Sequence, residues 1–334
     1  MSERSILVTG GAGYIGSHVV RQLGERDENV VVLDNLSTGF ADSVLAGQLI
    51  TGDTGDAELL ESLFSRHHFE TVMHFAASTV VPESVENPLK YYRNNTANSR
   101  TLLEACQKFG TKHVVFSSTA AVYGILDSGF AAEDSPTLPI NPYGRSKLMT
   151  EWMLRDLTEA GGPRHVILRY FNVAGCDPEG RIGQCTPNAT LLTKVACEAA
   201  VGIRDSVCIF GTDYDTPDGT GIRDYIHVED LAAAHVNALD YLRDGGESET
   251  LNCGYGHGYS VRELLNAVER AHGAALPIVE VERRAGDPPE LVAVAARIRD
   301  VLGWAPRYDD LDAIVSSALR WERQLAERQC RAAS

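Results

Sequence analysis

The chain has 334 residues and a formal net charge of −16, with 44% hydrophobic and 23% charged residues. This length suffices for one large domain or two ordinary ones, and the composition is typical of a soluble globular protein. The average surface repels polyanions, so neither nucleic acid nor an anionic membrane is an expected partner.

No apolar run approaches the ~20 residues that a membrane span needs, and the N-terminal segment lacks a signal-peptide cleavage region. These features predict a cytoplasmic location. The seven cysteines are odd in number and form no C-x-x-C pair, and the ten histidines are scattered along the chain. We therefore expect reduced thiols and no metal site.

Short apolar runs alternate with amphipathic stretches in the first half of the chain. The runs, which predict strands buried on both faces, are 5–10, 29–34, 71–76, 113–118 and 165–170. The helical patterns between them are 14–27, 57–67, 88–109 and 142–160. This alternation predicts an α/β fold with a doubly wound, parallel, Rossmann-type sheet.

The pattern changes after residue 171. Gly, Asp and Pro punctuate two long loops, 172–188 and 210–224, and long loops in a compact domain are usually functional. Further helical patterns are 191–201, 229–243, 260–272 and 309–327. We expect one domain over 1–171 and a smaller mixed α/β domain over 172–334, with a cleft between them. The chain can cross back into the first domain.

A glycine-rich turn, Thr9 to Gly16, joins the first predicted strand to a helix. Such a turn lets the backbone approach a pyrophosphate, and the helix N-terminus supplies free N–H groups. A plain strand–helix turn is the alternative, although the strand–turn–helix context favours a dinucleotide site. The candidate cofactor contacts in this turn are Gly10, Gly13, Tyr14, Ile15 and Gly16.

Asp34 ends the second predicted strand. A carboxylate in this place accepts hydrogen bonds from the adenosine ribose and repels a 2′-phosphate. The segment 35–38 holds no Arg or Lys, so we predict NAD rather than NADP. Asp53 is placed either to reach adenine or to close a turn, and the sequence leaves both readings open.

Tyr143 and Lys147 stand four residues apart in a predicted helix and so share one face. Taken alone, such a pair is more often a packing aromatic beside a solvent-facing charge. Here it follows a nucleotide-binding half, and Thr119 lies just beyond an earlier strand. Lys147 and the positive nicotinamide would both favour the phenolate, lowering the tyrosine pKa from its usual value of about 10.

These features belong to a longer series of motifs that runs through nearly the whole chain. The series is VTGGAGYIGSHV, LDNLSTG, HFAAS, NPLKYYRNN, SSTAAVYG, NPYGRSKL, LRYFNVAG, DGTGIRDYIHV and RRAGDPPEL. The chain resembles the UDP-glucose 4-epimerase family within the extended short-chain dehydrogenase/reductase superfamily. In related dehydratases and decarboxylases an acidic residue follows the strand-end hydroxyl, whereas this chain has Ala120.

The resemblance implies an NAD-dependent isomerase that interconverts UDP-glucose and UDP-galactose. A hydride would pass reversibly from sugar C4 to tightly bound NAD, through a 4-keto intermediate that turns over in the pocket. Tyr143 would exchange the proton of the 4-hydroxyl, with Lys147 beside it and Thr119 hydrogen-bonded to the same oxygen. Two alternatives stay open: a 4-epimerase of UDP-N-acetylglucosamine, UDP-xylose or UDP-glucuronate, and a catalytically silent NAD-binding regulator.

The resemblance also assigns binding residues. Those on the cofactor side, besides the residues above, are Asn35, Thr54, Phe75, Ala76, Ala77, Asn94 and Tyr170. Those on the substrate side, besides Thr119 and Tyr143, are Asn172, Leu191, Leu192, Phe210, Arg223, Arg284, Asp287 and Leu291. The domain over 1–171 would hold NAD and the catalytic residues, and the domain over 172–334 would hold the nucleotide sugar.

Individual roles follow from the same resemblance. Arg223 and Arg284 would hold the substrate pyrophosphate, Asp287 a ribose hydroxyl, and Phe210 the uracil. Leu291 would wall the pocket near the sugar C2 substituent, where a tyrosine restricts and a smaller residue widens specificity. A surface pair of Arg223 with Asp224 and a solvated face at 283–284 are the structural alternatives.

A homodimer is expected, with helices 88–109 and 142–160 pairing with their copies in a four-helix bundle. The candidate contacts are Leu102, Leu103, Ala105, Cys106, Phe109, Leu148, Trp152 and Leu154. The alternative is that these apolar residues serve only the core of their own chain.

Overall fold

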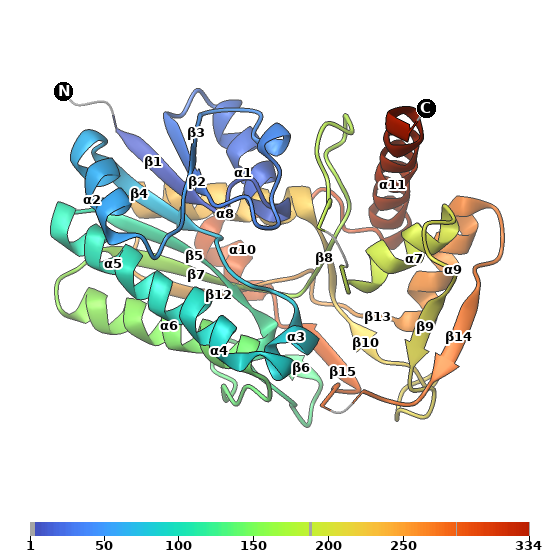
Figure 1. The fold of residues 1–334 in the computed structure, drawn as a ribbon. Helices are drawn as coiled ribbons and strands as arrows, with labels where there is room; N and C mark the ends of the chain where they lie inside the picture. Colours follow the sequence, from blue (N-terminus) through green and yellow to red (C-terminus); the bar gives the residue numbers. More distant parts are fainter. Residues whose placement is uncertain (1–3, 187–188, 285, 334) are drawn as a thin grey trace.

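The computed structural model describes residues 4–186, 189–284 and 286–333. Its centre is a seven-stranded sheet with strand order β12-β7-β5-β4-β1-β2-β3, in which every pairing is parallel (Figure 1). The strands are β1 (Ser5–Thr9), β2 (Val30–Asp34), β3 (Gln48–Thr51), β4 (Phe69–His74), β5 (His113–Thr119), β7 (Arg164–Tyr170) and β12 (Glu249–Cys253). The predicted Rossmann-type sheet is confirmed.

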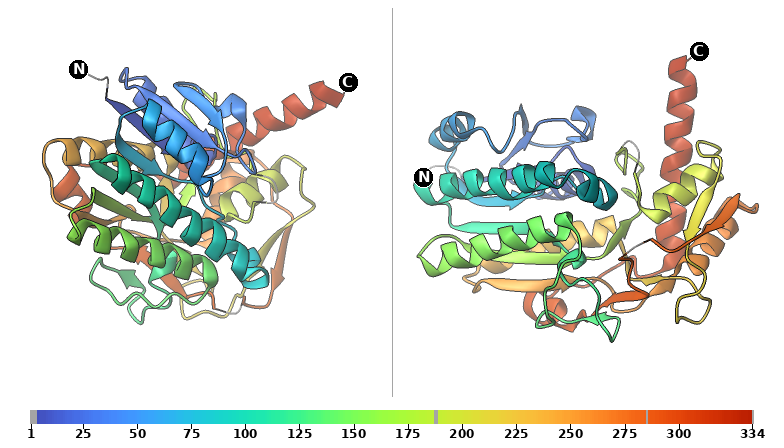
Figure 2. Two further views of the ribbon diagram at one scale, coloured as in Figure 1. Left: turned by 60° about the vertical axis from the view of Figure 1, so that its left-hand side comes forward. Right: turned by 60° about the horizontal axis from the view of Figure 1, so that its bottom comes forward.

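Helices cover both faces of this sheet (Figures 1 and 2). One face carries α2 (Ala57–Arg66), α5 (Asn98–Phe109) and α6 (Pro142–Glu159), and the other carries α1 (Tyr14–Gly24), α8 (Val228–Arg243) and α10 (Ala296–Leu302). Successive residues of a strand belong to two hydrophobic cores on opposite faces of the sheet. Leu7 packs toward α2 and α5, whereas Ile6 and Val8 pack toward α1 and α8. Burial on both faces explains why the strands read as continuous apolar runs.

The central sheet takes its last strand from beyond residue 171. β12 pairs with β7, with Leu251 opposite Leu168, and α8 packs against α1. The chain therefore returns to the first part of the fold after it has left it. The segment between β7 and β12, which contributes to the smaller lobe, is therefore attached to the central sheet at both of its ends.

The smaller lobe lies beside the carboxyl ends of the central strands (Figure 1). Its helices are α7 (Leu192–Ala200), α9 (Val261–His272) and α11 (Leu311–Ala333). Its paired strands are β9 (Val207–Phe210) with β14 (Ile278–Val281), β8 (Asn172–Ala174) with β11 (Tyr225–His227), and the order β13 (Tyr259–Ser260), β10 (Ile222–Arg223), β15 (Glu290–Ala293), β6 (Phe130–Ala131). The C-terminal end of α11 extends away from the rest of the molecule (Figure 2).

The helix predicted over 88–109 is one helical run with a change of winding inside it. It consists of α4 (Pro88–Tyr91), the π-helical η2 (Tyr92–Ala97) and α5. A π turn adds a residue per turn and is frequent at functional sites. Here the Asn95 side chain binds the Ser78 backbone N–H at 2.8 Å and the Ser146 hydroxyl at 3.0 Å. Hydrophobic periodicity does not reveal such a winding change.

Short helices outside these layers complete the fold. They are η1 (Ala41–Ser43), α3 (Val81–Glu86) and η3 (Ala120–Val122). The sequence reading missed α3, although a proline near the first turn, Pro82, is a helix-start signal.

Most of the residues predicted to form the dimer contact serve the core of their own chain. Leu102, Leu103, Ala105, Cys106, Leu148 and Leu154 are buried, and Phe109 packs against the same core. Trp152 is the exception, with half of its surface exposed. The prediction is therefore wrong for the buried residues, because the apolar stripes of α5 and α6 face the sheet.

Six cysteines whose side chains the structure describes are unpaired thiols, and Cys330 lies outside the described side chains. Within the described residues, no helix combines the length and the hydrophobicity of a transmembrane span. No group of three His, Cys, Asp or Glu side chains in that same part of the chain is placed to hold a metal ion.

Candidate active site

A pocket of about 900 Å³ opens at the carboxyl ends of the central strands. It extends from the turn after β1 across β4 and β5 to the loops of the smaller lobe. β1 lies between β2 and β4, so the pocket stands where the strand order reverses. Ligands of open parallel sheets bind at this position.

Two glycines of the turn after β1 have no space for a side chain. Gly10 has φ +71°, and a Cβ there would lie 2.5 Å from the Ala76 backbone nitrogen. A Cβ on Gly16 would lie 2.3 Å from the Gly10 carbonyl oxygen. Helix α1 begins at Tyr14, and no side chain caps its first N–H groups. The turn therefore presents bare backbone donors to the pocket, which suits a pyrophosphate.

Asp34 is buried at the end of β2 and lines the pocket. One carboxylate oxygen accepts the Ala12 N–H at 2.9 Å, and the other accepts the Leu36 N–H at 2.8 Å. These bonds fix the carboxylate, while its remaining lone pairs can accept ribose hydroxyls. The neighbouring lining residues Ser37 and Thr38 carry no positive charge for a 2′-phosphate.

Asp53 serves the local turn and also lines the pocket. Its carboxylate accepts hydrogen bonds from the Gly55 N–H and from the Asn35 and Asn98 amides, each at 2.8 Å. The turn reading is therefore realised in the structure. Asn35 and Thr54 line the pocket beside it.

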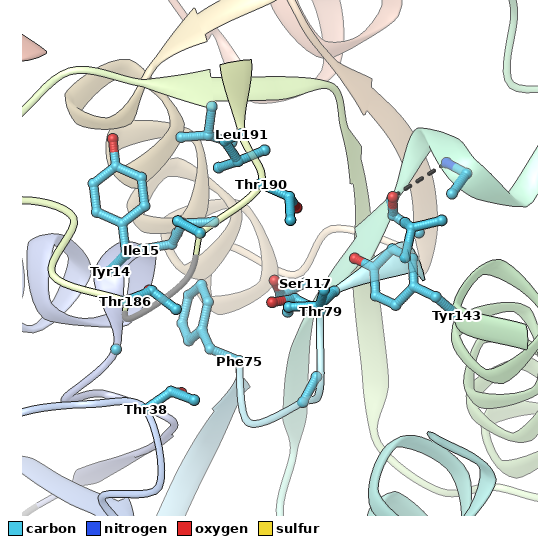
Figure 3. Close-up of a pocket in the computed structure, with 18 of the residues that line it drawn as sticks. Tyr14, Ile15, Thr38, Phe75, Thr79, Ser117, Tyr143, Thr186, Thr190 and Leu191 are labelled. Atoms are coloured by element: carbon cyan, nitrogen blue, oxygen red, sulfur yellow. Dashed lines mark hydrogen bonds between the residues drawn. The ribbon is translucent and has the colours of Figure 1, made fainter. Parts of the chain in front are cut away.

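The other residues predicted on the cofactor side also line the pocket. They are Phe75, Ala76, Ala77, Asn94 and Tyr170, together with Gly13 and Ile15. Figure 3 shows the Phe75 ring between the glycine turn with Tyr14 and the strand end with Ser117. The Tyr170 and Ser117 hydroxyls are hydrogen-bonded at 2.5 Å.

Tyr143 stands in the first turn of α6 and points its hydroxyl into the pocket (Figure 3). The side chain of Asn141 caps this helix by accepting the Gly144 N–H at 2.8 Å. Thr119 ends β5 and lines the same pocket. Its hydroxyl also accepts the Ala121 N–H at 3.1 Å, so Thr119 caps the following loop as well as facing the pocket.

Burial raises the pKa of Tyr143, and the neighbouring Thr119 hydroxyl opposes part of that rise. Burial thus opposes the lowering expected from Lys147 and the nicotinamide together, and that lowering stays a prediction.

Lys147 lies behind the strand end rather than on the pocket wall. It is buried, and its Nζ donates to the Ser117 carbonyl oxygen at 2.8 Å. Burial lowers the pKa of Lys147 to about 7, and the Glu151 carboxylate opposes this effect. The lysine thus fastens the end of β5 to α6.

The substrate-side wall is built from charged side chains of the smaller lobe. Arg223 and Arg284 both line the pocket, as does Asp287, whose carboxylate lies 3.6 Å from Arg223 Nη2. The Arg284 guanidinium lies over the Phe210 ring, 3.4 Å from its centroid. Phe210 itself lies outside the pocket lining and reaches it only through Arg284.

The structural alternative of an Arg223–Asp224 surface pair does not hold. Asp224 is buried and accepts the Tyr255 and Gly256 N–H groups at 3.0 and 2.9 Å. This anchoring of the loop leaves Arg223 free to line the pocket.

Asn172, Leu191 and Leu291 line the pocket as predicted, and Leu192 does not, because it begins helix α7 with its side chain against the core. Sequence reasoning missed the apolar part of the wall. This part consists of Val80, Val81, Pro82, Val85 and Ile140. It also missed Ser117, although the hydroxyl run that ends β5 was a visible signal.

Residues 6–254 match the model of the "NAD dependent epimerase/dehydratase family". This chain belongs to that family. It is 60% identical over 323 residues to a UDP-glucose 4-epimerase of Azospirillum brasilense, covering 96% of this chain and 93% of the relative.

Solved structures of similar proteins have the same fold. A UDP-glucose 4-epimerase from Brucella ovis in complex with NAD is 44% identical, has a TM-score of 0.93, and is matched over 96% of this chain and 98% of its own. The UDP-Glc/GlcNAc 4-epimerase of Campylobacter jejuni is 49% identical, with a TM-score of 0.85 and coverage of 96% and 99%.

The pocket of this epimerase/dehydratase family member fits NAD. The glycine turn leaves room for the backbone to approach a pyrophosphate, and Asp34 is held ready for ribose hydroxyls. Among the described lining residues, the cations are Arg223 and Arg284, both from the substrate-side lobe. The cofactor of the family, NAD, would therefore meet the glycine turn and Asp34 at one end and Tyr143 at the other.

Proposed function

We propose that this protein is a UDP-glucose 4-epimerase, an isomerase that interconverts UDP-glucose and UDP-galactose. The observation that carries the proposal is one continuous pocket: it joins a dinucleotide-binding turn to Tyr143 and Thr119 and then to the two arginines of the substrate lobe. Bound NAD supplies a hydride acceptor that can also return the hydride to sugar C4.

Tyr143 moves the proton in this proposal. Its hydroxyl faces the pocket, where it can take the proton of the sugar 4-hydroxyl and later give it back. Because burial favours the neutral phenol, groups that stabilise the phenolate control this step. Thr119 is one such group, and it is also placed to hydrogen-bond the sugar oxygen.

Ala120, the residue after Thr119, also lines the pocket. It offers no acid or base for moving further protons. The reaction therefore stops at oxidation and re-reduction of one carbon, without elimination or decarboxylation.

The substrate lobe supplies binding at a distance from the reacting carbon. Arg223 and Arg284 are permanently charged and can bind the oxygens of a diphosphate. Asp287 lies beside Arg223, where it would accept a ribose hydroxyl, and the Phe210 ring packs against the Arg284 guanidinium. We assign NAD and the chemistry to the part over 1–171 and the nucleotide sugar to the part over 172–334.

A second candidate activity is 4-epimerisation of UDP-N-acetylglucosamine. Leu291 lines the pocket and is smaller than a tyrosine, and the Campylobacter jejuni relative is named for both sugars. Leucine still fills more of the wall than serine does. We expect the glucose pair to be the main substrates and the N-acetyl sugar to react weakly.

A homodimer is also part of the proposal. α5 and α6 lie side by side on one face of the sheet, and Trp152 is exposed on α6 (Figure 1). An exposed tryptophan is a typical anchor of protein–protein interfaces. Trp152→Glu should turn a dimer in light scattering into a monomer, and a monomeric wild type would refute this part.

The direct test of the activity uses the purified protein and UDP-galactose without any added reductant. We expect UDP-glucose to accumulate to equilibrium and NAD to co-purify, because release of the reduced cofactor would strand an oxidised sugar. No conversion in either direction would refute the epimerase. If the protein converts only UDP-xylose or UDP-glucuronate, it is a 4-epimerase of that sugar and not of UDP-glucose.

A further inference from the structure

A buried carboxylate joins three elements directly behind the reacting groups. Glu151 lies on α6, one turn after Lys147, and is fully buried. Its Oε1 accepts the Ser118 hydroxyl at 2.6 Å and Arg169 Nε at 3.0 Å, and its Oε2 accepts Arg169 Nη2 at 2.6 Å. Ser118 is the residue before Thr119 at the end of β5. The carboxylate thus ties β5, α6 and β7 together.

The hydrogen bonds continue from Arg169 into the return strand. Arg169 Nη1 donates to the Tyr123 hydroxyl at 3.0 Å, and that hydroxyl donates to Asn252 Oδ1 on β12 at 2.6 Å. Asn252 Nδ2 then donates to the Ala131 carbonyl on β6 at 2.8 Å. The network therefore runs from helix α6, which carries Tyr143, to β12 and β6.

Stability alone does not explain such an arrangement. Replacing a buried ion pair by apolar residues of similar volume is often neutral or stabilising, because both charges must leave water. The ion pair of Glu151 with Arg169 is buried on both sides. What distinguishes its position is that it contacts the residue before Thr119 and lies one helical turn from Lys147.

The surroundings of Lys147 leave Glu151 as the group that favours its charge. Burial lowers the pKa of Lys147 to about 7, and Glu151 raises it. His74 on β4 stays neutral, since burial lowers its pKa to about 3. Burial raises the pKa of Tyr143 and of Tyr170 on β7, so neither phenol supplies a negative charge in the resting protein.

Two arginines face the carboxylate. Arg155 on α6, whose side chain is partly exposed, donates to Glu151 Oε2 at 3.0 Å. Arg169 on β7 is paired with Glu151, so its positive charge is balanced only while that carboxylate is present. Phe116 on β5 offers its ring face to Lys147, with Nζ 4.9 Å from the centroid. Without the carboxylate, the site would hold two buried cations, Lys147 and Arg169, and the partly exposed Arg155.

We propose that Glu151 is a positioning residue for the reaction. It holds the strand end that presents Thr119 against the helix that presents Tyr143, and it keeps Lys147 an ammonium that grips the Ser117 carbonyl. The inference rests on the proposed epimerase activity and adds a residue that does not touch the substrate.

The main test is Glu151→Gln, a substitution that keeps the shape of the side chain and removes its charge. We expect kcat for UDP-galactose to fall by about 10- to 100-fold, as for small misplacements of reacting groups, with KM nearly unchanged. The alkaline limb of the kcat–pH profile should move to lower pH, because Lys147 then loses its proton earlier. Glu151→Asp keeps the charge and should keep the position of the limb.

The matched control is Glu322→Gln. Glu322 forms a buried ion pair with Lys194 at 2.6 Å in the smaller lobe, outside the lining of the large pocket. This variant should lower the melting temperature and leave the position of the profile unchanged. If Glu151→Gln behaves in the same way, with an unmoved limb, Glu151 has a structural role only and the proposal is wrong.

A measurement on the resting enzyme separates this inference from the activity. The side-chain ¹³Cε signal of Lys147 in lysine-labelled protein, followed by NMR over a pH series, reports the pH at which its amine becomes neutral, and it needs no reagent to reach the buried group. That pH should be lower in Glu151→Gln than in the wild type, whichever sugar the enzyme uses. An equal pH in both proteins overturns the electrostatic role even if UDP-galactose is converted.

If Glu151→Gln alone does not fold, the double variant Glu151→Gln/Arg169→Met removes both buried charges. We expect it to fold, since the buried Glu151–Arg169 pair is removed as a whole and Arg155 can reach solvent. It should also keep the lowered pH at which Lys147 becomes neutral. A wild-type value in this variant would contradict the proposal.

Discussion

The two walls of the pocket are built in different ways. The cofactor wall consists of strand ends and backbone, with Asp34 fixed by two N–H donors and Gly10 and Gly16 in close backbone contact. The substrate wall consists of charged side chains, with Arg223 on the short strand β10 and Arg284 and Asp287 on the loop after β14. Asp287 keeps 40% of its side-chain surface exposed. The first wall is rigid by construction, whereas the second wall acts through side-chain charge.

This difference suits a reaction that has no net redox change. The cofactor must stay bound through the whole cycle, so its wall is made of groups that cannot move without unfolding a turn or a strand. The nucleotide sugar must come and go, and its binding depends on a few charged contacts. Substitutions on the two walls should therefore fail in different ways.

The largest effect is expected where the two walls meet, at Tyr143. Tyr143→Phe removes the hydroxyl that exchanges the proton and keeps the buried ring. We expect turnover of UDP-galactose to fall by about 10²- to 10⁴-fold, the usual contribution of a general acid–base group. The bound NAD, measured by absorbance after denaturation, and the melting temperature should stay near wild type. Near-normal turnover would remove Tyr143 from the mechanism.

The cofactor wall was readable from sequence because each of its signals is local. The glycine turn, Asp34, and the spacing of Tyr143 and Lys147 are all short motifs placed by strand–helix alternation, and the structure puts Asp34 and Tyr143 on the pocket wall. Local spacing could not show where the Lys147 side chain points. Lys147 faces the Ser117 carbonyl rather than the pocket.

The substrate wall was less readable because its contacts join distant segments. Arg284, just after β14, stacks on Phe210 at the end of the paired strand β9, which lies much earlier in the chain. The central sheet likewise takes its last strand, β12, from far along the chain. The predicted dimer residues show a related limit. An amphipathic stripe says that a helix face is covered, but it does not say whether the sheet or a second copy covers it; Leu102 and Leu154 turned out to face the sheet.

Arg284→Ala tests the substrate wall, with Arg283→Ala as its matched control. Arg284 lines the pocket, whereas Arg283 lies over Tyr214 and pairs with Asp213. Loss of a charged hydrogen bond typically costs about 1.5–3 kcal/mol, which corresponds to a rise in KM of roughly 10- to 100-fold. Steady-state kinetics should show this rise for Arg284→Ala, with kcat changed less. Equal effects of the two variants would show that general charge, rather than a pocket contact, binds the substrate.

Leu291 should tune sugar choice within the same wall. Leu291→Tyr adds a ring and a hydroxyl to the pocket, and overpacking of this kind costs about 1–3 kcal/mol for the larger sugar. We expect it to abolish the weak UDP-N-acetylglucosamine activity and to spare the glucose pair, while Leu291→Ser widens acceptance. The measurement is the ratio of kcat/KM for the two sugars. A ratio that neither substitution changes would place the C2 substituent elsewhere in the pocket.

The stability of the fold in acid should depend on buried histidines that have no role in turnover at neutral pH. Burial lowers the pKa of a group of histidines in and against the central sheet: His18, His74, His113, His165, His227 and His235. Because their folded pKa lies below the unfolded value of about 6.5, unfolding takes up protons in acid. The stability that they contribute is complete above that value and is lost as the pH falls through the folded values, which for His165 means toward about 4.

The free energy of unfolding should therefore fall between about pH 6.5 and 4.5, by about 1.4 kcal/mol per pH unit for each proton taken up on unfolding. The melting temperature should fall with it. His165 is a suitable residue for the test, because it binds the Thr158 hydroxyl at 2.8 Å and does not line the pocket. His165→Gln removes one titrating group, so its melting temperature should depend less on pH over this range than that of the wild type. An identical slope in calorimetry would mean that His165 binds its proton equally well in the folded and unfolded chains. The acid sensitivity would then come from other groups, among them the five remaining buried histidines.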